Sequence, residues 1–351
     1  MEHQVLLFTG GDVSRSLPAN YSEEDSRYFV HELCRRMPDV YLKKVENICA
    51  CDNGFLFDAI SVLPDSFPSG QLPGAISGKK ARLKLFAKLL VKRCVISLLW
   101  MRSESDCLWI ADTWSGGYFH WMTDALPRLL AAQKTCYSGI LLPQSLSRYE
   151  YVAPSLKPFY SGDIRFTGKA VRCRSLLIPT HTAPTGNYNE VLVKRLRDVY
   201  TSYYCNASAQ EALPGKIYVS RSKALKRKVV NERECISVLV GYGFHVVCLE
   251  DYEFDRQAQI CLAAKFMVSN HGAGLTNMIF MQAGAAVLEL RKKRDFRNNC
   301  YFALASALSL KYFYQLCESS DSSEDAHAAD LIVDCLELEG NIQKMLLGCN
   351  G

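Results

Sequence analysis

The stretch Ser269-Asn270-His271-Gly272-Ala273-Gly274-Leu275-Thr276-Asn277 lies between apolar runs at residues 265–268 and 278–281. We expect a strand before this turn and a helix after it. Gly272 and Gly274 remove side-chain crowding from the turn, and the first free N–H groups of the helix then point beyond the strand. The turn is suited to an anion, but similar turns also serve as plain corners, and this one lacks the full dinucleotide fingerprint.

Around this turn the second half of the chain alternates between strands and helices. We expect strands at residues 216–220, 244–249, 265–269, 286–290 and 312–316, and helices at residues 190–204, 231–242, 254–264, 275–282 and 298–310. This alternation is typical of a doubly wound α/β domain, whose ligands bind beyond the carboxyl ends of the strands.

The first half of the chain also alternates, although less regularly. We expect a strand at residues 5–9, a hairpin around Asp52-Asn53-Gly54, strands at residues 95–100, 107–111, 139–142 and 175–179, and a helix after Gly116-Gly117. A chain of 351 residues exceeds one hydrophobic core. We therefore predict an N-terminal domain over residues 1–186, a second domain over residues 187–317, and an acidic loop with a last strand (330–338) and helix (341–347) in residues 318–351.

Composition restricts the classes of partner. The net charge of +5 suits an anionic ligand but is too small to indicate nucleic acid. Fifteen scattered cysteines are typical of buried thiols in a reducing compartment, and residues 1–10 do not form a signal peptide. We expect a cytoplasmic protein. A basic amphipathic helix at residues 79–93 has two interpretations, a solvated face or contact with an anionic membrane surface.

Several side chains that suit an anionic ligand follow the predicted strands of the second domain. Arg221 and Glu250 directly follow the predicted strands at 216–220 and 244–249. His271 follows the strand at 265–269 after one intervening residue, and Glu289 lies near the end of the strand at 286–290. Guanidinium groups offer paired donors to phosphate oxygens, so Arg221 and Arg227 are candidates for a pyrophosphate, with Glu289 as acceptor for ribose hydroxyls. Alternatively, Arg227 belongs to a solvated basic loop, and Glu289 pairs with a neighbouring cation.

The first domain has one dense stretch of polar and aromatic residues, from Gly116 to Arg128. On a helix, His120, Asp124 and Arg128 fall on one face. An imidazole and a carboxylate placed together can remove a proton from an attacking hydroxyl. The alternative is a surface ion pair between Asp124 and Arg128. Pro127 is expected to kink or restart the helix.

Taken together, these blocks resemble glycosyltransferase family 61. The resemblance is carried by residues 118–129, Ser220-Arg221, Arg227-Lys228, Asn231-Glu232 and His271 to Asn277, in this order and spacing. It implies a GT-B architecture, with two Rossmann-like domains facing across a cleft. It also implies an inverting transfer from a nucleotide sugar, in particular a UDP-sugar, to a hydroxyl of a glycan or glycoconjugate, with no required cofactor or metal.

The resemblance assigns roles to individual residues. The catalytic candidates are Asp124 and His120. The residues that match the donor-side motifs are Arg221, Arg227, Asn231, His271, Gly272, Gly274, Thr276 and Asn277. With Ala273 and Leu275 of the same turn, and with Glu250 and Glu289 from the strand ends, they form the set of nucleotide-sugar-binding candidates. Secretory-pathway members of the family carry an N-terminal anchor or signal, and we expect none in this chain. This expectation favours a microbial, cytoplasmic enzyme that builds a polysaccharide or glycoconjugate. Two alternatives stay open: another nucleotide-using Rossmann enzyme, and a non-catalytic relative that binds a glycan or a partner.

Overall fold

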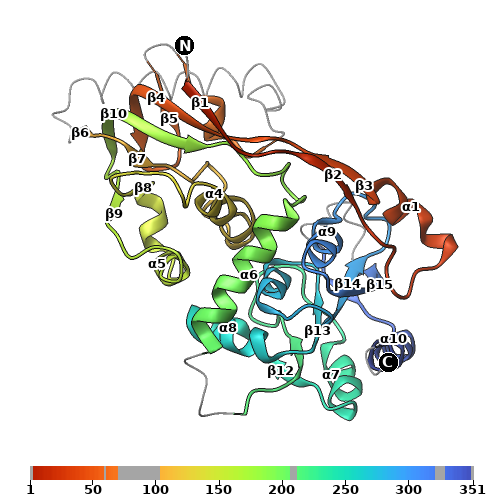
Figure 1. Cartoon of the computed structure of the whole chain (residues 1–351). Helices are drawn as coiled ribbons and strands as arrows, with labels where there is room; N and C mark the ends of the chain where they lie inside the picture. Colours follow the sequence, from red (N-terminus) through yellow and green to blue (C-terminus); the bar gives the residue numbers. More distant parts are fainter. Residues whose placement is uncertain (1–2, 59–60, 70–102, 206–211, 321–328, 349–351) are drawn as a thin grey trace. The chain divides into compact units, whose positions relative to one another are not determined.

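The computed structural model describes residues 3–58, 61–69, 103–205, 212–320 and 329–348. These residues form two compact units, and each is described here by itself (Figure 1). Unit 1 comprises Met1–Gly11 and Pro38–Thr185, and unit 2 comprises Asp12–Met37 and Gly186–Gly351. The expected basic helix at residues 79–93 and the expected strand at 95–100 lie outside the described residues. Within the described parts of the chain, no helix is both long and apolar enough to span a lipid bilayer.

Unit 1 is built on a mixed sheet with the main order β1-β4-β10-β7-β8-β9. The strands are β1 (His3–Phe8), β4 (Val40–Cys51), β5 (Leu56–Phe57), β6 (Ser103–Glu104), β7 (Cys107–Leu108), β8 (Ile140–Leu142), β9 (Ile164–Phe166) and β10 (Ala170–Pro179). β10, β7, β8 and β9 run parallel, whereas β4 is antiparallel to both β1 and β10. The parallel strands match the expected α/β pattern, and the antiparallel β4 departs from a purely parallel sheet.

The expected hairpin around Gly54 is confirmed. β5 pairs with β4 in antiparallel fashion, and Gly54 adopts a positive φ of 89° between them. A Cβ at this position would also lie 2.7 Å from the carbonyl oxygen of Asp112. Glycine is therefore required here both by the left-handed conformation and by close packing.

Among the described residues of unit 1, the helical segments are short. They are η3 (Pro64–Ser66), α3 (Tyr118–His120), η5 (Trp121–Ala125), α4 (Leu126–Ala131), η6 (Gln144–Arg148) and α5 (Val152–Leu156). α3, η5 and α4 form one continuous helical run, and η5 is its π-helical turn. The wider π-helical turn directly precedes Leu126 and Pro127, where the sequence predicted a kink or a restart of the helix.

Unit 2 contains a six-stranded sheet in the order β12-β11-β13-β14-β15-β16. Its strands are β11 (Lys216–Val219), β12 (His245–Val247), β13 (Phe266–Asn270), β14 (Ala286–Lys292), β15 (Lys311–Ser319) and β16 (Leu331–Ile332). All are parallel except β16, which pairs antiparallel with β15. Along the chain, the five parallel strands follow the flavodoxin-like order 2-1-3-4-5, in which the strand order reverses between β11 and β13. The predicted doubly wound α/β sheet is confirmed.

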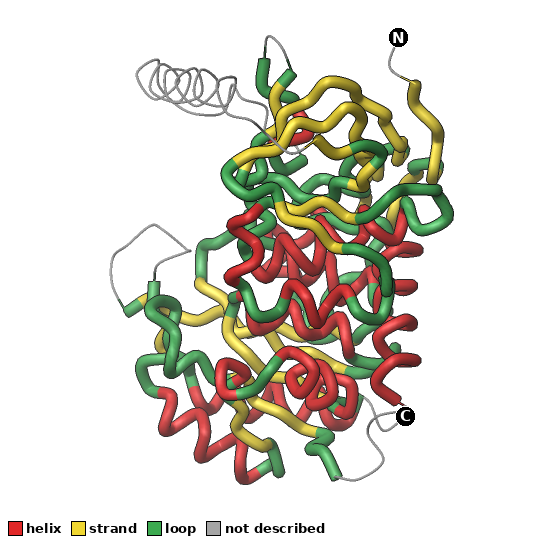
Figure 2. Tube along the Cα trace, turned by 90° about the vertical axis from the view of Figure 1, so that its left-hand side faces the viewer, coloured by secondary structure: helices red, strands yellow, loops and turns green. Residues whose placement is uncertain are grey.

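Helices flank the strands of unit 2 (Figure 2). α7 (Glu232–Gly241) and α10 (Cys335–Leu347) pack together, while α6 (Glu190–Cys205), α8 (Phe254–Ala263), α9 (Cys300–Ala307) and the 3₁₀ helix η8 (Ala273–Phe280) form a second packed group. A shorter 3₁₀ turn, η7 (Leu249–Asp251), follows β12. The helix expected after the glycine turn is present, but it is 3₁₀ and begins at Ala273.

The expected strand at residues 330–338 is mostly wrong. Only Leu331–Ile332 is a strand, and α10 begins at Cys335. The cause is a helix cap, because the side chain of Asp334 accepts hydrogen bonds from the backbone N–H groups of Leu336 and Glu337. Such a cap stabilises a helix by about 1 kcal/mol.

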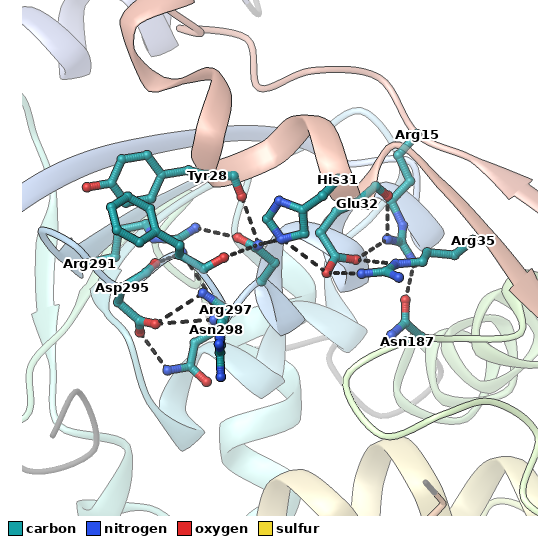
Figure 3. A network of polar contacts seen from close by, with 12 residues as sticks. Arg15, Tyr28, His31, Glu32, Arg35, Asn187, Arg291, Asp295, Arg297 and Asn298 are labelled. Carbon is teal, nitrogen blue, oxygen red and sulfur yellow. Dashed lines mark hydrogen bonds and ion pairs between the residues drawn. The ribbon is translucent and has the colours of Figure 1, made fainter.

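An N-terminal segment belongs to unit 2, although it precedes most of unit 1 in the sequence. It contains β2 (Gly11–Ser14), η1 (Glu23–Asp25), α1 (Ser26–Phe29), η2 (Val30–Glu32) and β3 (Cys34–Met37), with β2 paired to β3. Glu32 accepts hydrogen bonds from Arg15 and Arg35, and Arg15 also donates to Asn187 at 2.6 Å (Figure 3). The expected N-terminal domain over residues 1–186 included this segment, because its contacts with unit 2 join residues far apart in the sequence and no local pattern indicates them.

Candidate active site

The strand order of unit 2 reverses between β11 and β13, and the donor-side candidates Arg221 and His271 follow these two strands. β11 ends at Val219 and is followed by Arg221, while the adjacent β13 ends at Asn270 and is followed by His271 and Gly272. The two strands are parallel, so their carboxyl ends open on the same edge of the sheet. In open α/β sheets, ligands bind at this edge where the order reverses.

Gly272 lies against the guanidinium of Arg221. A Cβ at position 272 would lie 2.6 Å from Nη1 and 2.9 Å from Cζ of Arg221. The φ of Gly272 is 161°, an extended value that any residue adopts, so the glycine is required for close approach and not for its conformation. Gly274 allows a similar approach to β11, since a Cβ there would lie 3.1 Å from Cγ1 of Val219.

Arg221 and Arg227 form a pair of neighbouring cations. Burial lowers the pKa of Arg221, and the positive charge of Arg227 lowers it further. Arg227 has a left-handed φ of 58°, and its carbonyl accepts a hydrogen bond from the buried amide of Asn270. The Nε atoms of both arginines are buried without a hydrogen-bond partner. A buried unsatisfied donor costs about 1–3 kcal/mol, so an anion that accepts from both groups would bind favourably.

His271 is held by a buried carboxylate. Its Nδ1 lies 2.5 Å from Oε1 of Glu289, and the hydroxyl of Tyr312 donates to Oε2 of Glu289 at 2.5 Å. Burial raises the pKa of Glu289, but the hydrogen bond and charge of His271, the charge of Arg291 and the hydrogen bond from Tyr312 together keep this pKa below its usual range. The carboxylate is therefore ionised, so Nδ1 of His271 carries the proton.

This geometry changes the role expected of Glu289. Its side chain is fully buried, and both of its oxygens accept hydrogen bonds inside unit 2. A direct bond to a ribose hydroxyl does not fit this arrangement. Glu289 instead orients the imidazole of His271.

The other donor-side candidates do not present side chains to the turn as expected, because they bond the backbone, are exposed in a neighbouring turn or are buried inside η8. Both polar atoms of the Asn231 side chain bond the backbone of Val333, which ties the start of α7 to the segment after β16. Glu250 is exposed in η7, and its charge opposes the lowering of the Arg221 pKa by a smaller amount than burial and Arg227 produce. The side chains of Leu275, Thr276 and Asn277 are buried inside η8, and the helix itself starts at Ala273. For a ligand at this turn, η8 therefore offers backbone N–H groups rather than these side chains.

In unit 1, the helical run brings together the two catalytic candidates. Nδ1 of His120 lies 2.8 Å from Oδ2 of Asp124. The same Oδ2 accepts a hydrogen bond from the hydroxyl of Thr185 at 3.4 Å. The side chain of His120 is 21% exposed and that of Asp124 only 6%, so the imidazole is the more accessible member of the pair.

Arg128 does not share this face, and it makes no surface ion pair with Asp124. It is completely buried and donates to the backbone carbonyls of Pro179 at 2.8 Å and Ile110 at 3.0 Å. The π-helical turn η5 explains the difference, because its extra residue rotates everything after it relative to an ideal α-helix. Arg128 thus fastens the backbone after β7 to the end of β10.

A second carboxylate–imidazole pair, Asp112 and His181, lies beyond the carboxyl ends of β7 and β10. Nε2 of His181 is 3.1 Å from Oδ2 of Asp112, and the Asp112 side chain is 1% exposed. Burial raises the pKa of Asp112, but the hydrogen bond and charge of His181, the charge of Arg128 and the backbone N–H of Trp114 together lower this pKa below its usual value. This pair was not predicted from the sequence. Its available signal was that each residue follows one of two predicted strands, 107–111 and 175–179.

Comparison with known proteins gives the class of this chain. Residues 118–288 match the family model described as Glycosyltransferase 61. This range begins at the helical run of His120 and ends in β14, so it includes the carboxyl ends of β11 and β13. The resemblance inferred from the motifs is confirmed: residues 118–288 have the sequence pattern of glycosyltransferase family 61, which supports a glycosyltransferase.

Individual relatives match over a shorter region. The EGF domain-specific O-linked N-acetylglucosamine transferase of Gallus gallus is 33% identical over 91 residues, which cover 24% of this chain and 17% of the relative. The protein of the same name from Drosophila melanogaster is 33% identical over 98 residues, covering 27% and 18% respectively. The chain thus aligns with less than one fifth of the length of these curated relatives.

Proposed function

We propose that the protein transfers a sugar, with inversion, from a nucleotide sugar to a hydroxyl group of a glycan or glycoprotein acceptor. One observation carries the proposal. Arg221 and Arg227 lie at the reversal point of a doubly wound sheet with buried, unpartnered Nε atoms, and Arg221 packs on Gly272. Two adjacent cations with free donors suit a diphosphate, which is the leaving group of a nucleotide sugar.

The donor would bind at the carboxyl ends of β11 and β13. In the proposed complex, Arg221 and Arg227 bind the diphosphate and the first N–H groups of η8 add further donors. His271, fixed by Glu289, presents its other ring nitrogen to the donor. We propose a UDP-sugar as the donor, in accordance with the sequence-based expectation.

The acceptor hydroxyl would be activated in unit 1. The pair of His120 and Asp124 supplies a base, with Asp124 removing the proton directly or through His120. The acceptor oxygen forms a bond to the anomeric carbon while the bond from that carbon to the phosphate oxygen breaks. The nucleoside diphosphate leaves with the bonding electron pair, and the anomeric configuration inverts.

Two further features complete the proposal. The first is the GT-B architecture, in which one Rossmann-like domain binds the donor and the other the acceptor. The second is that cationic side chains and helix N–H groups take the place of a metal ion at the leaving diphosphate. A structure with both substrates tests the first feature, and turnover in the presence of a chelator tests the second.

The relatives' name indicates one acceptor to try first. Those proteins are named for transfer of N-acetylglucosamine to EGF domains. We therefore include UDP-N-acetylglucosamine and a folded EGF domain among the substrates, beside simple glycans.

The deciding experiment begins with a thermal-shift screen of nucleoside diphosphates and nucleotide sugars. Ligands that bind the folded state raise the melting temperature by mass action. The best donor is then incubated with acceptors, with and without EDTA, and nucleotide release is measured. Release that depends on acceptor and persists in EDTA is expected. Binding without any turnover or donor hydrolysis would instead indicate a non-catalytic relative, and stabilisation by NAD alone would indicate a different nucleotide-using enzyme.

A further inference from the structure

One large aromatic side chain of unit 1 is exposed beside the proposed base. The side chain of Trp114 is 39% exposed, whereas Trp109 and Trp121 are completely buried. The indole lies next to the imidazole of His120, with ring centroids 4.9 Å apart and planes inclined by 58°. Exposure of a single apolar residue is ordinary. The position of the exposed Trp114 beside the polar pair of His120 and Asp124, however, is not accounted for by burial in the hydrophobic core.

The structure uses buried polar groups to hold this exposed residue. The backbone N–H of Trp114 donates to Oδ1 of Asp112 at 2.8 Å, and the hydroxyl of Ser115 donates to the same oxygen at 3.1 Å. The other oxygen of Asp112 pairs with His181. The carbonyl of Trp114 accepts from the N–H of Gly117 at 2.9 Å. The loop is thus fixed on both sides of the indole, which favours a preorganised binding element.

More aromatic rings continue from the same loop. The hydroxyl of Tyr151 donates to the carbonyl of Gly116 at 2.7 Å, and its ring packs against Tyr118 with centroids 5.1 Å apart. Tyr149 stacks on Tyr151 at 5.5 Å. Gly116 leaves room for this cluster, because a Cβ there would lie 3.0 Å from the hydroxyl of Tyr149. All three tyrosines are partly exposed.

This combination fits the chemistry of a sugar ring. One face of a pyranose carries C–H bonds, which pack on the electron-rich face of an aromatic ring, while its hydroxyls require polar partners at the edge. Trp114 offers the ring, and His120 and Asp124 offer the polar partners. A serine or threonine side chain lacks the flat C–H face that a pyranose would place on the indole.

We propose that Trp114 is the platform on which a pyranose ring of the acceptor stacks, so that the acceptor group itself is a sugar. This inference rests on the proposed function for the identity of the acceptor, and it deepens that function by naming the substrate class. The buried pair of Asp112 and His181 acts as a positioning element for the platform. The tyrosines around Gly116 extend the aromatic surface beyond the reacting sugar.

The test measures sugar binding without nucleotide, by saturation-transfer difference NMR. The probes are methyl β-D-glucopyranoside, methyl β-D-galactopyranoside and methyl N-acetyl-β-D-glucosaminide. The variants are W114L and W114A, which remove the flat face, and W114F, which keeps a smaller one. Y160A is the matched control, because Tyr160 is another partly exposed ring of unit 1, paired with Tyr137.

We expect at least one probe to bind the wild-type protein and the Y160A control. W114L should weaken that binding about tenfold, and W114F less. Circular dichroism checks folding, and if W114A is unfolded the comparison of W114L with W114F decides. No saturation of any probe in the wild type, or equal saturation in W114L, overturns the platform. A serine-bearing EGF domain that accepts sugar equally well from W114L and wild type also overturns it.

UDP binding is measured on the same samples and separates the two proposals. If W114L loses the sugar probe but keeps UDP binding, both proposals are supported. If the wild type binds the sugar through Trp114 but binds no nucleotide, the platform stands as a carbohydrate site and the transferase function fails.

Discussion

Nδ1 of His271 lies 2.5 Å from the Oε1 atom of Glu289, a carboxylate that is completely buried. His271 directly follows β13, and Glu289 lies on the adjacent parallel strand β14. The hydroxyl of Tyr312, on the next strand, satisfies the second oxygen of Glu289. A chain of three side chains across three strands therefore fixes the imidazole that follows the glycine turn.

The ionised state of Glu289 makes stability depend on pH. Because the folded protein lowers the pKa of this group from 4.5, its contribution is fully present above pH 4.5 and is lost as pH falls through the lower folded value. E289Q should lower the free energy of unfolding by about 2 kcal/mol at pH 7. Below pH 4.5 the free energy of unfolding of E289Q should fall less steeply with pH than that of the wild type. Urea unfolding at several pH values measures both effects, with E253Q, at an exposed position, as control. Equal acid sensitivity of E289Q and wild type would contradict this assignment.

The close approach of Arg221 to Gly272 leads to a separate expectation. G272A should keep the fold, because the backbone at 272 is extended, but it should displace the guanidinium and weaken UDP binding about tenfold. G241A is the control, since a Cβ at Gly241 meets nothing within 4 Å. Titration calorimetry and circular dichroism give the two readouts. A folded G272A protein with wild-type affinity would show that Arg221 does not touch the nucleotide.

The base in unit 1 can be tested independently of the donor site. D124N keeps the shape of the side chain but removes its charge, so turnover should fall by about 10²- to 10⁴-fold while UDP affinity is unchanged. D163N is the control, because Asp163 is an exposed carboxylate of the same unit, paired with Arg165. Nucleotide release with saturating substrates provides the rate. Turnover above one tenth of wild type would assign the base to another group.

Local patterns in the sequence were sufficient for the sheet of unit 2. The apolar run before His271 and the glycines after it predicted β13 and the following helix. Positions of the other parallel strands were also predicted within a few residues, because buried parallel strands form continuous apolar runs. The resemblance to glycosyltransferase family 61 followed from the same motifs, and the family model matches the region that contains them.

Long-range packing decided the features that the sequence did not reveal. The reason for Gly272 is the side chain of Arg221, far away along the chain, and no local rule indicates that contact. Arg128 lies after a π-helical turn and donates to carbonyls at the end of β10 and after β7, and these partners are more than ten residues away along the chain. The pair of Asp112 and His181 likewise required knowledge that β7 and β10 are neighbours.

The central claim is that a nucleoside diphosphate binds Arg221 and Arg227, and titration calorimetry of UDP tests it most directly. R221A and R227A should each weaken binding by about 1.5–3 kcal/mol, which is roughly 10- to 150-fold. K223A is the matched control in the same basic loop, because Lys223 pairs with Asp251 and should change affinity less than about twofold. Equal UDP affinity in wild type, R221A and R227A would contradict the account.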